Sequence, residues 1–307
     1  MRLHMSSIVG HIISAVVVKH IMKPKVDPEK NSIEQIRQST KVLSSKIKLP
    51  KSTIIEKFAI GSLPAEWIKA GNVCDDKNNV ILYFHSGGFC LEYSITHREL
   101  AARISSASGV PVLAIEYRLA PENPYPAANE DCLQAYRWLL EKEVPPENIV
   151  IGGDSSGAGL AMMTLLSLRE MGMPLPAAAF LLSPMGLDLT KFDGASYTEK
   201  AGADPLNTLA CIRIYAKYYT GSSAAKPPVI FDQDLHGLPH LLIQVGSNEV
   251  LLSDAVRLSE RAKLAGIDVT LEIWKNMWHI FQMFSFVPEA KQAINNVGDF
   301  VKKNLRI

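Results

Sequence analysis

The chain has 307 residues, of which 47% are hydrophobic, so it is long and apolar enough for one large α/β domain or two smaller domains. Its 32 lysines and arginines balance 31 aspartates and glutamates to a formal charge of +1, which gives no electrostatic case for a nucleic-acid partner. It contains no uninterrupted apolar run of about 18 residues, so we expect no membrane-spanning helix.

The four cysteines are Cys74, Cys90, Cys132 and Cys211. They form no C-x-x-C pair, and a core of this size needs no disulfide cross-links. We therefore expect free thiols in a reducing compartment. The sequence predicts a cytoplasmic protein without a metal site.

Residues 1–50 are predicted to be helical, with one polar side. Within them, the apolar side chains of Ile8–Val18 fall on one helical face, which favours an amphipathic helix docked on the rest of the protein. The same stretch resembles the core of an export signal. However, Gly10, His11 and Ser14 interrupt it, and no small-residue cleavage site follows. The docking helix is the preferred interpretation, and the export signal is the alternative.

From residue 51 onward, short apolar runs rich in β-formers alternate with helical patterns. The predicted strands are 54–60, 65–69, 79–85, 110–116, 148–152, 178–183, 240–245 and 269–274. The predicted helices between them are 97–107, 127–143, 157–171, 253–265 and 288–304. Several strands are apolar throughout, as expected where helices cover both faces of a parallel sheet. The alternation predicts an α/β protein with a mostly parallel, eight-stranded, doubly wound sheet.

One segment interrupts this alternation. Between Leu189 and Leu238 no strand is predicted, and a single helix is expected at 205–219. The segment is too long for an ordinary connection, so we interpret it as an insertion that lies over the sheet.

The last predicted strand, 269–274, has apolar residues at alternate positions and contains no proline. An unprotected edge strand of this kind can pair with a second copy of the chain. We therefore predict a homodimer formed through this strand.

The strongest chemical signal is the segment Gly153-Asp154-Ser155-Ser156-Gly157, which follows a strand and opens a helix. A G-x-S-x-G motif in this context is a nucleophile elbow, whose tight turn requires the glycines. The turn lifts the Ser155 hydroxyl to the carboxyl edge of the sheet. Ser156 lies one position past the apex, so we expect its backbone N–H, and not its side chain, to take part in the chemistry.

A second glycine-rich segment, His85-Ser86-Gly87-Gly88-Phe89, follows the strand at 79–85. Acyl transfer passes through a tetrahedral oxyanion that needs preorganised N–H donors. Gly87 and Gly88 allow the backbone to approach a ligand closely, and with the N–H of Ser156 they form a predicted three-donor oxyanion hole. We interpret His85 as a residue that holds this loop by hydrogen bonding.

A serine nucleophile needs a general base, which follows it in the chain order of this fold. Only His236, His240 and His279 follow Ser155. His236 lies in the exit loop of the insertion and His240 begins a strand, whereas His279 lies in the loop after the last strand. We therefore predict His279 as the base.

The acid that orients the base is expected in the loop after the strand at 240–245. Glu249 lies in that loop and is the preferred acid. Asp254 lies where the next helix starts, where a carboxylate has an ordinary role with the helix dipole. Asp254 stays the alternative.

With these residues the chain resembles the hormone-sensitive-lipase-like family of α/β-hydrolase esterases, also called bacterial lipolytic family IV. The segment Tyr117-Arg118-Leu119-Ala120-Pro121-Glu122, followed by Pro126-Ala127-Ala128 and Asp131, is similar to the family's long signature. The match covers about residues 65–305. The family's H-G-G-G loop reads H-S-G-G here, with Ser86 in place of the first glycine. The family's usual Asp-Pro-Leu at the acid reads Glu249-Val250-Leu251, which is similar to a subset that uses glutamate.

The resemblance implies an α/β-hydrolase fold in which residues 1–50 and an insertion at about 190–225 form a helical cap on a catalytic domain at 51–307. It also implies hydrolysis of small carboxylic esters without a cofactor, with short to medium acyl chains preferred. Phe89, Met185 and Ile280 neighbour the catalytic loops and are predicted to line the substrate pocket. The alternatives are a lactonase or amidase at the same site, or a non-catalytic ligand-binding member of the family.

Overall fold

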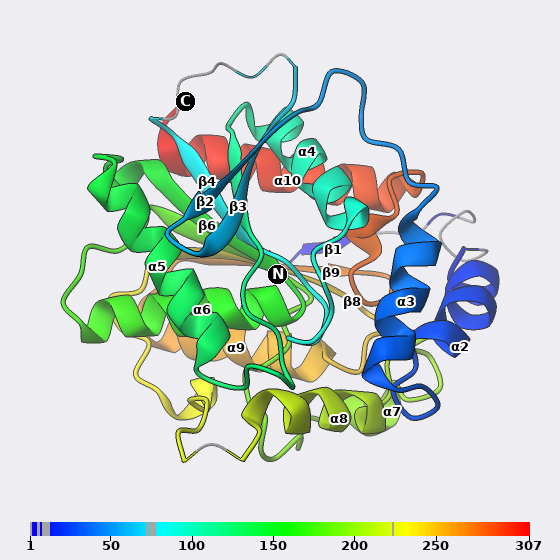
Figure 1. Cartoon of the computed structure of the whole chain (residues 1–307). Coiled ribbons are helices and arrows are strands. Elements are labelled where there is room, and N and C mark those ends of the chain that lie inside the picture. Colours follow the sequence, from blue (N-terminus) through cyan, green and yellow to red (C-terminus); the bar gives the residue numbers. More distant parts are fainter. Residues whose placement is uncertain (1, 5–6, 8–12, 72, 74–77, 223) are drawn as a thin grey trace.

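The computed structural model describes residues 2–4, 7, 13–71, 73, 78–222 and 224–307 (Figure 1). The strands in this part of the chain are β1 (Arg2–His4), β2 (Ile54–Ile60), β3 (Leu63–Lys69), β4 (Val80–Phe84), β5 (Val112–Ile115), β6 (Ile149–Asp154), β7 (Ala178–Leu182), β8 (His240–Gly246) and β9 (Val269–Trp274). The α-helices are α2 (Lys23–Val26), α3 (Ile33–Ser44), α4 (Ile95–Ser108), α5 (Ala127–Glu141), α6 (Ser156–Glu170), α7 (Ser196–Glu199), α8 (Leu209–Thr220), α9 (Leu252–Leu264) and α10 (Pro288–Leu305). A π-helix, η1 (Ile13–Met22), precedes them, and three short 3-10 turns are η2 (Pro146–Asn148), η3 (Ile230–Asp232) and η4 (Phe281–Met283).

The nine strands of the described residues form one sheet, in the order β1-β9-β8-β7-β6-β4-β5-β3-β2. Strands β4 to β9 are parallel to their neighbours within that set, whereas β3 pairs antiparallel with both β5 and β2. All eight predicted strands are present as β2 to β9. The α/β class and the mostly parallel sheet are therefore confirmed.

Alternating residues of β4 show how the sheet buries both of its faces. Leu82 and Phe84 belong to the core that contains residues of α5, α6 and α9, whereas Ile81 and Tyr83 belong to the core that contains residues of α4 and α10. Figure 1 shows α4 and α10 on one side of the sheet and α6 and α9 on the other. Burial on both faces explains why these strands are continuous apolar runs.

The parallel strands place several loops at one edge of the sheet. Because β4, β6, β7, β8 and β9 run in the same direction, their carboxyl ends meet there. The residues that follow these ends include His85, Ser155, Ser183, Glu249 and His279. The topology therefore gathers these five side chains from distant parts of the chain.

The prediction that strand 269–274 is an unprotected edge is wrong. In the structure β1 pairs in parallel with the second half of β9, with Arg2 opposite Glu272 and His4 opposite Trp274. The short β1 also corrects the expectation that residues 1–50 are helical throughout. With β1 alongside it, β9 is an inner strand, and the argument for a homodimer through that strand is lost.

Two groups of helices flank the carboxyl edge of the sheet, on the side where Figure 1 shows α2, α3, α7 and α8. In the first group, α3 begins with a capping box between Ser32 and Gln35. Arg37 of α3 then donates to the carboxylate of Glu122 and, at 2.9 Å, to the backbone carbonyl of Cys90. These contacts fix the N-terminal helices to the loops around the site.

The second group, α7 and α8, comes from the predicted insertion, although α8 begins later than the expected residue 205. Thr208, at the start of α8, donates to Glu29 at 3.2 Å, and Cys211 Sγ lies 3.3 Å from the Asp27 carboxylate. The insertion is thus joined to the chain that follows α2. Division of the molecule into cap and catalytic domain stays a prediction.

Two further expectations concern the cysteines and the N-terminal segment. Cys90, Cys132 and Cys211 are free and buried, whereas Cys74 lies outside the described residues. The first part of Ile8–Val18 also lies outside them, and residues 13–18 belong to η1. Among the described helices, none is both long and apolar enough to cross a membrane.

Candidate active site

Ser155 occupies a strained turn between β6 and α6. Its φ of 51° and ψ of −118° place a non-glycine residue in an unfavourable backbone region, as expected at a nucleophile elbow. A Cβ at Gly157 would lie 2.0 Å from the Phe84 carbonyl oxygen, and one at Gly153 would lie 2.4 Å from the Gly157 backbone. Both glycines are therefore required by close backbone packing, and together they allow the turn that presents Ser155.

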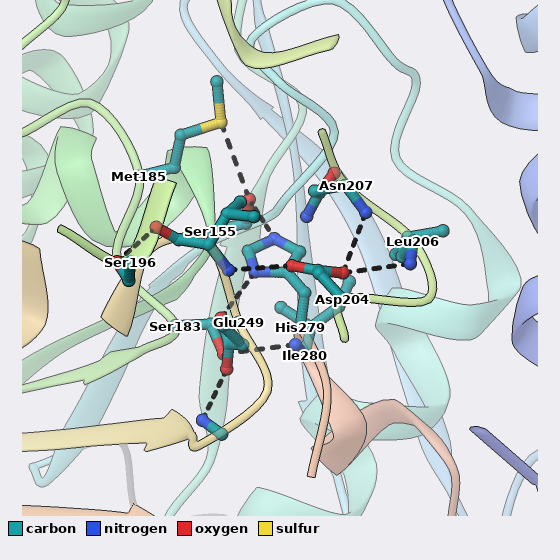
Figure 2. A network of polar contacts seen from close by, with 12 residues as sticks. Ser155, Ser183, Met185, Ser196, Asp204, Leu206, Asn207, Glu249, His279 and Ile280 are labelled. Carbon is teal, nitrogen blue, oxygen red and sulfur yellow. Dashed lines mark hydrogen bonds and ion pairs between the residues drawn. The ribbon is translucent and has the colours of Figure 1, made fainter. Parts of the chain in front are cut away.

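The structure brings Ser155, His279 and Glu249 together from three loops (Figure 2). The His279 Nε2 atom lies 2.8 Å from Ser155 Oγ, and His279 Nδ1 lies 2.9 Å from Glu249 Oε2. All three residues are buried, with Glu249 fully inaccessible. Because the carboxylate accepts from Nδ1–H, the ring nitrogen that faces Ser155 is the one free to take a proton.

Glu249 is held by more than the histidine. Its Oε1 atom accepts from Ser183 Oγ at 2.7 Å and from the Gly246 N–H at 2.5 Å. Ser183 Oγ also accepts from the Ile280 N–H at 3.1 Å, one residue after His279. Glu249 and the loop that carries His279 are thus tied to the same serine at the end of β7.

The residues weighed as alternatives lie elsewhere. Asp254 accepts from the Tyr197 hydroxyl at 2.6 Å, in the first turn of α9. His236 is exposed beside Asp234, and His240 Nδ1 lies 3.1 Å from the Asn304 side chain. None of these three is part of the contacts around Ser155.

His85 is bonded and stacked at the start of the glycine loop. Its ring stacks on Tyr117 at 4.2 Å, and its carbonyl accepts from the Tyr117 hydroxyl at 2.8 Å. Burial lowers the pKa of His85 to about 4, so its ring is neutral at neutral pH. This agrees with the loop-holding role expected from the sequence.

The predicted oxyanion donors lie on the loop after β4 and at the start of α6. Gly87 and Gly88 have φ values of 123° and 60°, which favour glycine. A Cβ at Gly88 would lie 2.6 Å from the ring of Tyr215 in α8, so the insertion packs directly on this loop. Ser156 is the first residue of α6, where backbone N–H groups have no partner within the helix.

Of the three predicted pocket residues, Met185 has its sulfur 3.9 Å from Ser155 Oγ. Phe89 is fully buried and stacks on Tyr219 of α8 at 3.8 Å. Ile280 is half-buried beside the base, with its backbone bonded to Ser183. The structure thus brings Met185 against the serine, and it places Phe89 under the insertion.

Sequence reasoning missed Asp204, which comes from the insertion. This buried carboxylate accepts from the Val250 N–H at 3.0 Å and from the N–H groups of Leu206 and Asn207, both at 2.9 Å. Val250 directly follows Glu249, so Asp204 joins the insertion to the acid loop. Burial raises the pKa of Asp204 to about 6 despite these donors. A lone aspartate in a segment without a strand gave no signal of this role.

Electrostatics favour the charged form of His279. Burial lowers the pKa of His279, but the hydrogen bond and charge of Glu249 outweigh it, with added effects of the Asp204 and Asp154 charges. The net result raises the pKa of His279 above its ordinary value. A histidine in this setting can accept the proton of Ser155 and hold it as an imidazolium.

Comparison with known proteins agrees with this fold and geometry. A model of the alpha/beta hydrolase fold family matches residues 81–283. An acetyl-hydrolase of Streptomyces hygroscopicus is 37% identical over 286 residues, or 92% of each chain. An esterase of Acinetobacter venetianus is 37% identical over 229 residues, covering 72% of this chain and 74% of its own.

Solved structures give the same result. An esterase of the bacterial hormone-sensitive lipase family superposes with a TM-score of 0.88 at 38% identity, covering 94% of this chain and 97% of its own. EstE5, in crystals soaked with p-nitrophenyl butyrate, superposes with a TM-score of 0.89 at 35% identity, covering 98% of this chain and all of its own.

These matches define an α/β-hydrolase of the esterase class. The chain belongs to the hormone-sensitive-lipase-like family. It is a carboxylic ester hydrolase, as its relatives named esterase and acetyl-hydrolase are. This outcome argues against the alternative of a non-catalytic ligand-binding member.

Proposed function

We propose that the protein is a serine carboxylesterase that cleaves short- to medium-chain esters through an acyl-enzyme. In this proposal Ser155 is the nucleophile, His279 the general base and Glu249 the acid that orients it. The observation that carries the proposal is the buried chain of contacts from Ser155 Oγ through His279 to Glu249, at 2.8 Å and 2.9 Å.

In the first half-reaction Ser155 Oγ attacks the ester carbonyl carbon while His279 Nε2 takes its proton. The carbonyl π electrons move onto the oxygen, whose negative charge is held by the N–H groups of Gly87, Gly88 and Ser156. Glu249 stabilises the imidazolium through Nδ1–H. When the tetrahedral intermediate collapses, the bond to the alkoxy oxygen breaks, and His279 returns the proton so that the alcohol leaves.

In the second half-reaction water takes the place of the alcohol. His279 removes a proton from the water as its oxygen attacks the acyl carbon. The same three N–H groups hold the second oxyanion. Collapse then breaks the bond to Ser155 Oγ, which regains its proton from His279, and the carboxylic acid is released.

Two contacts favour a small acyl group. Met185 lies 3.9 Å from Ser155 Oγ, and the ring of Tyr215 covers Gly88. Space beside the reacting carbon is therefore limited by side chains from the β7 loop and α8. The names of the relatives point the same way, since one is an acetyl-hydrolase and EstE5 was soaked with a butyrate ester.

We also propose that residues 1–50 and about 190–225 together form a cap that covers the site. Support comes from Arg37 on the N-terminal side, which bonds to the Cys90 carbonyl, and from Tyr219 of α8, which stacks on Phe89. Both contacts fall within a few residues of Gly88. Any movement of these helices would therefore change access to the glycine loop.

The test is the rate of hydrolysis of p-nitrophenyl esters from C2 to C16, with a p-nitroanilide and a lactone of matched acyl length. We expect the highest kcat/KM between C2 and C6, and much slower cleavage of the anilide and lactone. Faster turnover of the C16 ester than of the C4 ester would contradict the acyl-length assignment. If the lactone or the anilide were hydrolysed faster than the matched ester, the protein would instead be a lactonase or an amidase.

A further inference from the structure

Ser86, the residue that replaces a glycine of the family's loop, is held from two sides. Its Oγ atom lies 3.0 Å from His97 Nε2, in the first turn of α4. Its backbone N–H donates to Asp154 Oδ1 at 3.1 Å, and Asp154 directly precedes Ser155. Ser86 is buried, so both contacts are shielded from water. One residue therefore links the glycine loop to a helix and to the nucleophile turn.

The direction of the contact between His97 and Ser86 follows from the other ring nitrogen. His97 Nδ1 lies 2.9 Å from the backbone N of Ser94, and a backbone N–H can only donate. Nδ1 is therefore the acceptor and Nε2 carries the proton. The Ser86 hydroxyl oxygen accepts a hydrogen bond from Nε2–H. Burial holds the pKa of His97 well below its ordinary value, so the ring stays neutral and keeps this tautomer.

Asp154 completes the support beneath Ser86. Its Oδ1 atom also accepts from the hydroxyl of Tyr83, the penultimate residue of β4. Asp154 is fully buried at the end of β6. The carboxylate therefore ties the ends of two neighbouring strands to the start of the glycine loop.

The next two residues, Gly87 and Gly88, have no side chains with which to anchor themselves. After them, the N–H groups of Cys90 and Leu91 hold the Gly87 carbonyl at 3.0 and 2.9 Å. Ser86 is the matching anchor on the preceding side of the loop. The direction of the two glycine N–H groups is thus fixed from both ends.

We propose that Ser86 is a positioning residue, whose hydroxyl, held by His97, keeps the N–H groups of Gly87 and Gly88 aimed at the oxyanion. Preorganised donors stabilise the transition state without reorganising during the reaction. A looser loop weakens this stabilisation but leaves ground-state binding nearly unchanged. The proposal rests on the oxyanion hole assigned under the proposed function.

The experiment compares S86A, which removes the hydroxyl, with S86T, which keeps it. The readouts are kcat and KM for p-nitrophenyl butyrate and the inhibition constant of a trifluoromethyl ketone. Ser155 Oγ adds to the ketone carbonyl carbon, its proton passes to His279, and the carbonyl oxygen becomes an oxyanion in the hole. Removing one oxyanion donor outright costs about 10²–10³ in kcat. For S86A we expect about a 10-fold loss of kcat, KM within about twofold, and ketone binding weakened about 10-fold.

Two controls separate positioning from a general structural effect. S108A removes a buried α4 hydroxyl that donates to the Ile104 carbonyl, away from the glycine loop, and it is expected to leave kcat unchanged. The double variant S86A/H97F is expected to have the same kcat as the less active of the two single variants. Both changes break the same contact, between Ser86 Oγ and His97 Nε2. S86T is expected to keep kcat near the unmodified enzyme. If S86A does not fold, S86G gives the same test.

The proposal is overturned if S86A keeps kcat and ketone affinity within twofold, or if kcat falls while ketone affinity does not. It is also overturned if S108A loses as much kcat as S86A. If the unmodified enzyme hydrolyses no ester and does not bind the ketone, the proposed function fails instead, which distinguishes the two failures.

Discussion

Ser183 and Glu249 meet at the ends of neighbouring strands β7 and β8, where the serine hydroxyl donates to Glu249 Oε1 at 2.7 Å. The same hydroxyl oxygen accepts from the Ile280 N–H at 3.1 Å, next to His279. Ser183 has a φ of 48°, so its backbone is held in a region that a serine rarely occupies. This one side chain therefore sets the spacing between the proposed acid and the loop of the base.

Replacing Ser183 with alanine is expected to lower kcat about 10-fold, because a hydrogen bond to a charged group contributes about 1.5–3 kcal/mol. Ser183→Gly also lacks the hydroxyl but suits a φ of 48°, so it separates loss of the hydroxyl from backbone strain. Steady-state kinetics on p-nitrophenyl butyrate measure both. Equal kcat for S183A and the unmodified enzyme would show that Glu249 is positioned without this serine.

Removing the carboxylate of Glu249 is expected to lower kcat far more than removing that of Asp254, the alternative acid. Glu249→Ala takes away the carboxylate on His279 Nδ1, and loss of an orienting acid lowers kcat by on the order of 10⁴ in the serine proteases. Asp254→Ala breaks only the bond to Tyr197. The measurement is kcat on the high-pH plateau of the unmodified enzyme's pH profile. Comparable losses in the two variants would mean that they share the role.

The pH profile carries a second signature of the acid. Burial lowers the pKa of His279, but Glu249 raises it by more, so kcat/KM should fall as the pH drops through a value above about 6.5. Glu249→Gln removes the charge, so the acid limb is expected to move to lower pH while the plateau falls. Asp254→Asn should leave the limb in place. An unmoved limb in E249Q would contradict the assignment.

Shortening Met185 is expected to admit longer acyl chains. Its sulfur lies 3.9 Å from Ser155 Oγ, so Met185→Ala opens space beside the reacting carbon. One methylene in an apolar pocket contributes about 1–3 kcal/mol to discrimination, so the C8 to C4 ratio of kcat/KM should rise about 10-fold. Met162→Ala in the core of α6 is the matched control. An unchanged ratio in M185A would place the acyl group elsewhere.

The sequence predicted the strands well because several are short, apolar runs between helical patterns. Val80–Phe84 is the clearest case, since it is buried on both faces. The short β1 was missed because three residues give no periodicity to detect. That omission made β9 look like an edge and led to the incorrect basis for a dimer.

Ser155 and His279 could be proposed from the sequence because a nucleophile and its base follow local patterns and chain order. Ser183 and Asp204 could not, since each acts through a partner distant in the chain. Ser183 contacts Glu249, 66 residues away, and Asp204 contacts Val250, 46 residues away. Only the parallel packing of β7 and β8 and the seating of the insertion bring these pairs together.

The role of Ser86 could be predicted from the sequence only in part. Its departure from the family's glycine is visible in the sequence, but its partner His97 is not, because the contact needs the first turn of α4 to pack on the loop. The sequence therefore identifies where the loop is unusual, and the structure supplies the physical reason.

The most direct test of the central claim compares Ser155→Ala with Ser156→Ala. Each variant is assayed on p-nitrophenyl butyrate and treated with a fluorophosphonate, which loses fluoride and phosphonylates an activated serine hydroxyl. We predict that S155A loses on the order of 10⁴ or more in kcat, keeps its thermal unfolding midpoint and takes up no label. S156A should keep most of its activity, with the label on Ser155 by peptide mass spectrometry. An active S155A beside an inactive S156A, or a label on Ser156 in the unmodified enzyme, would contradict the account.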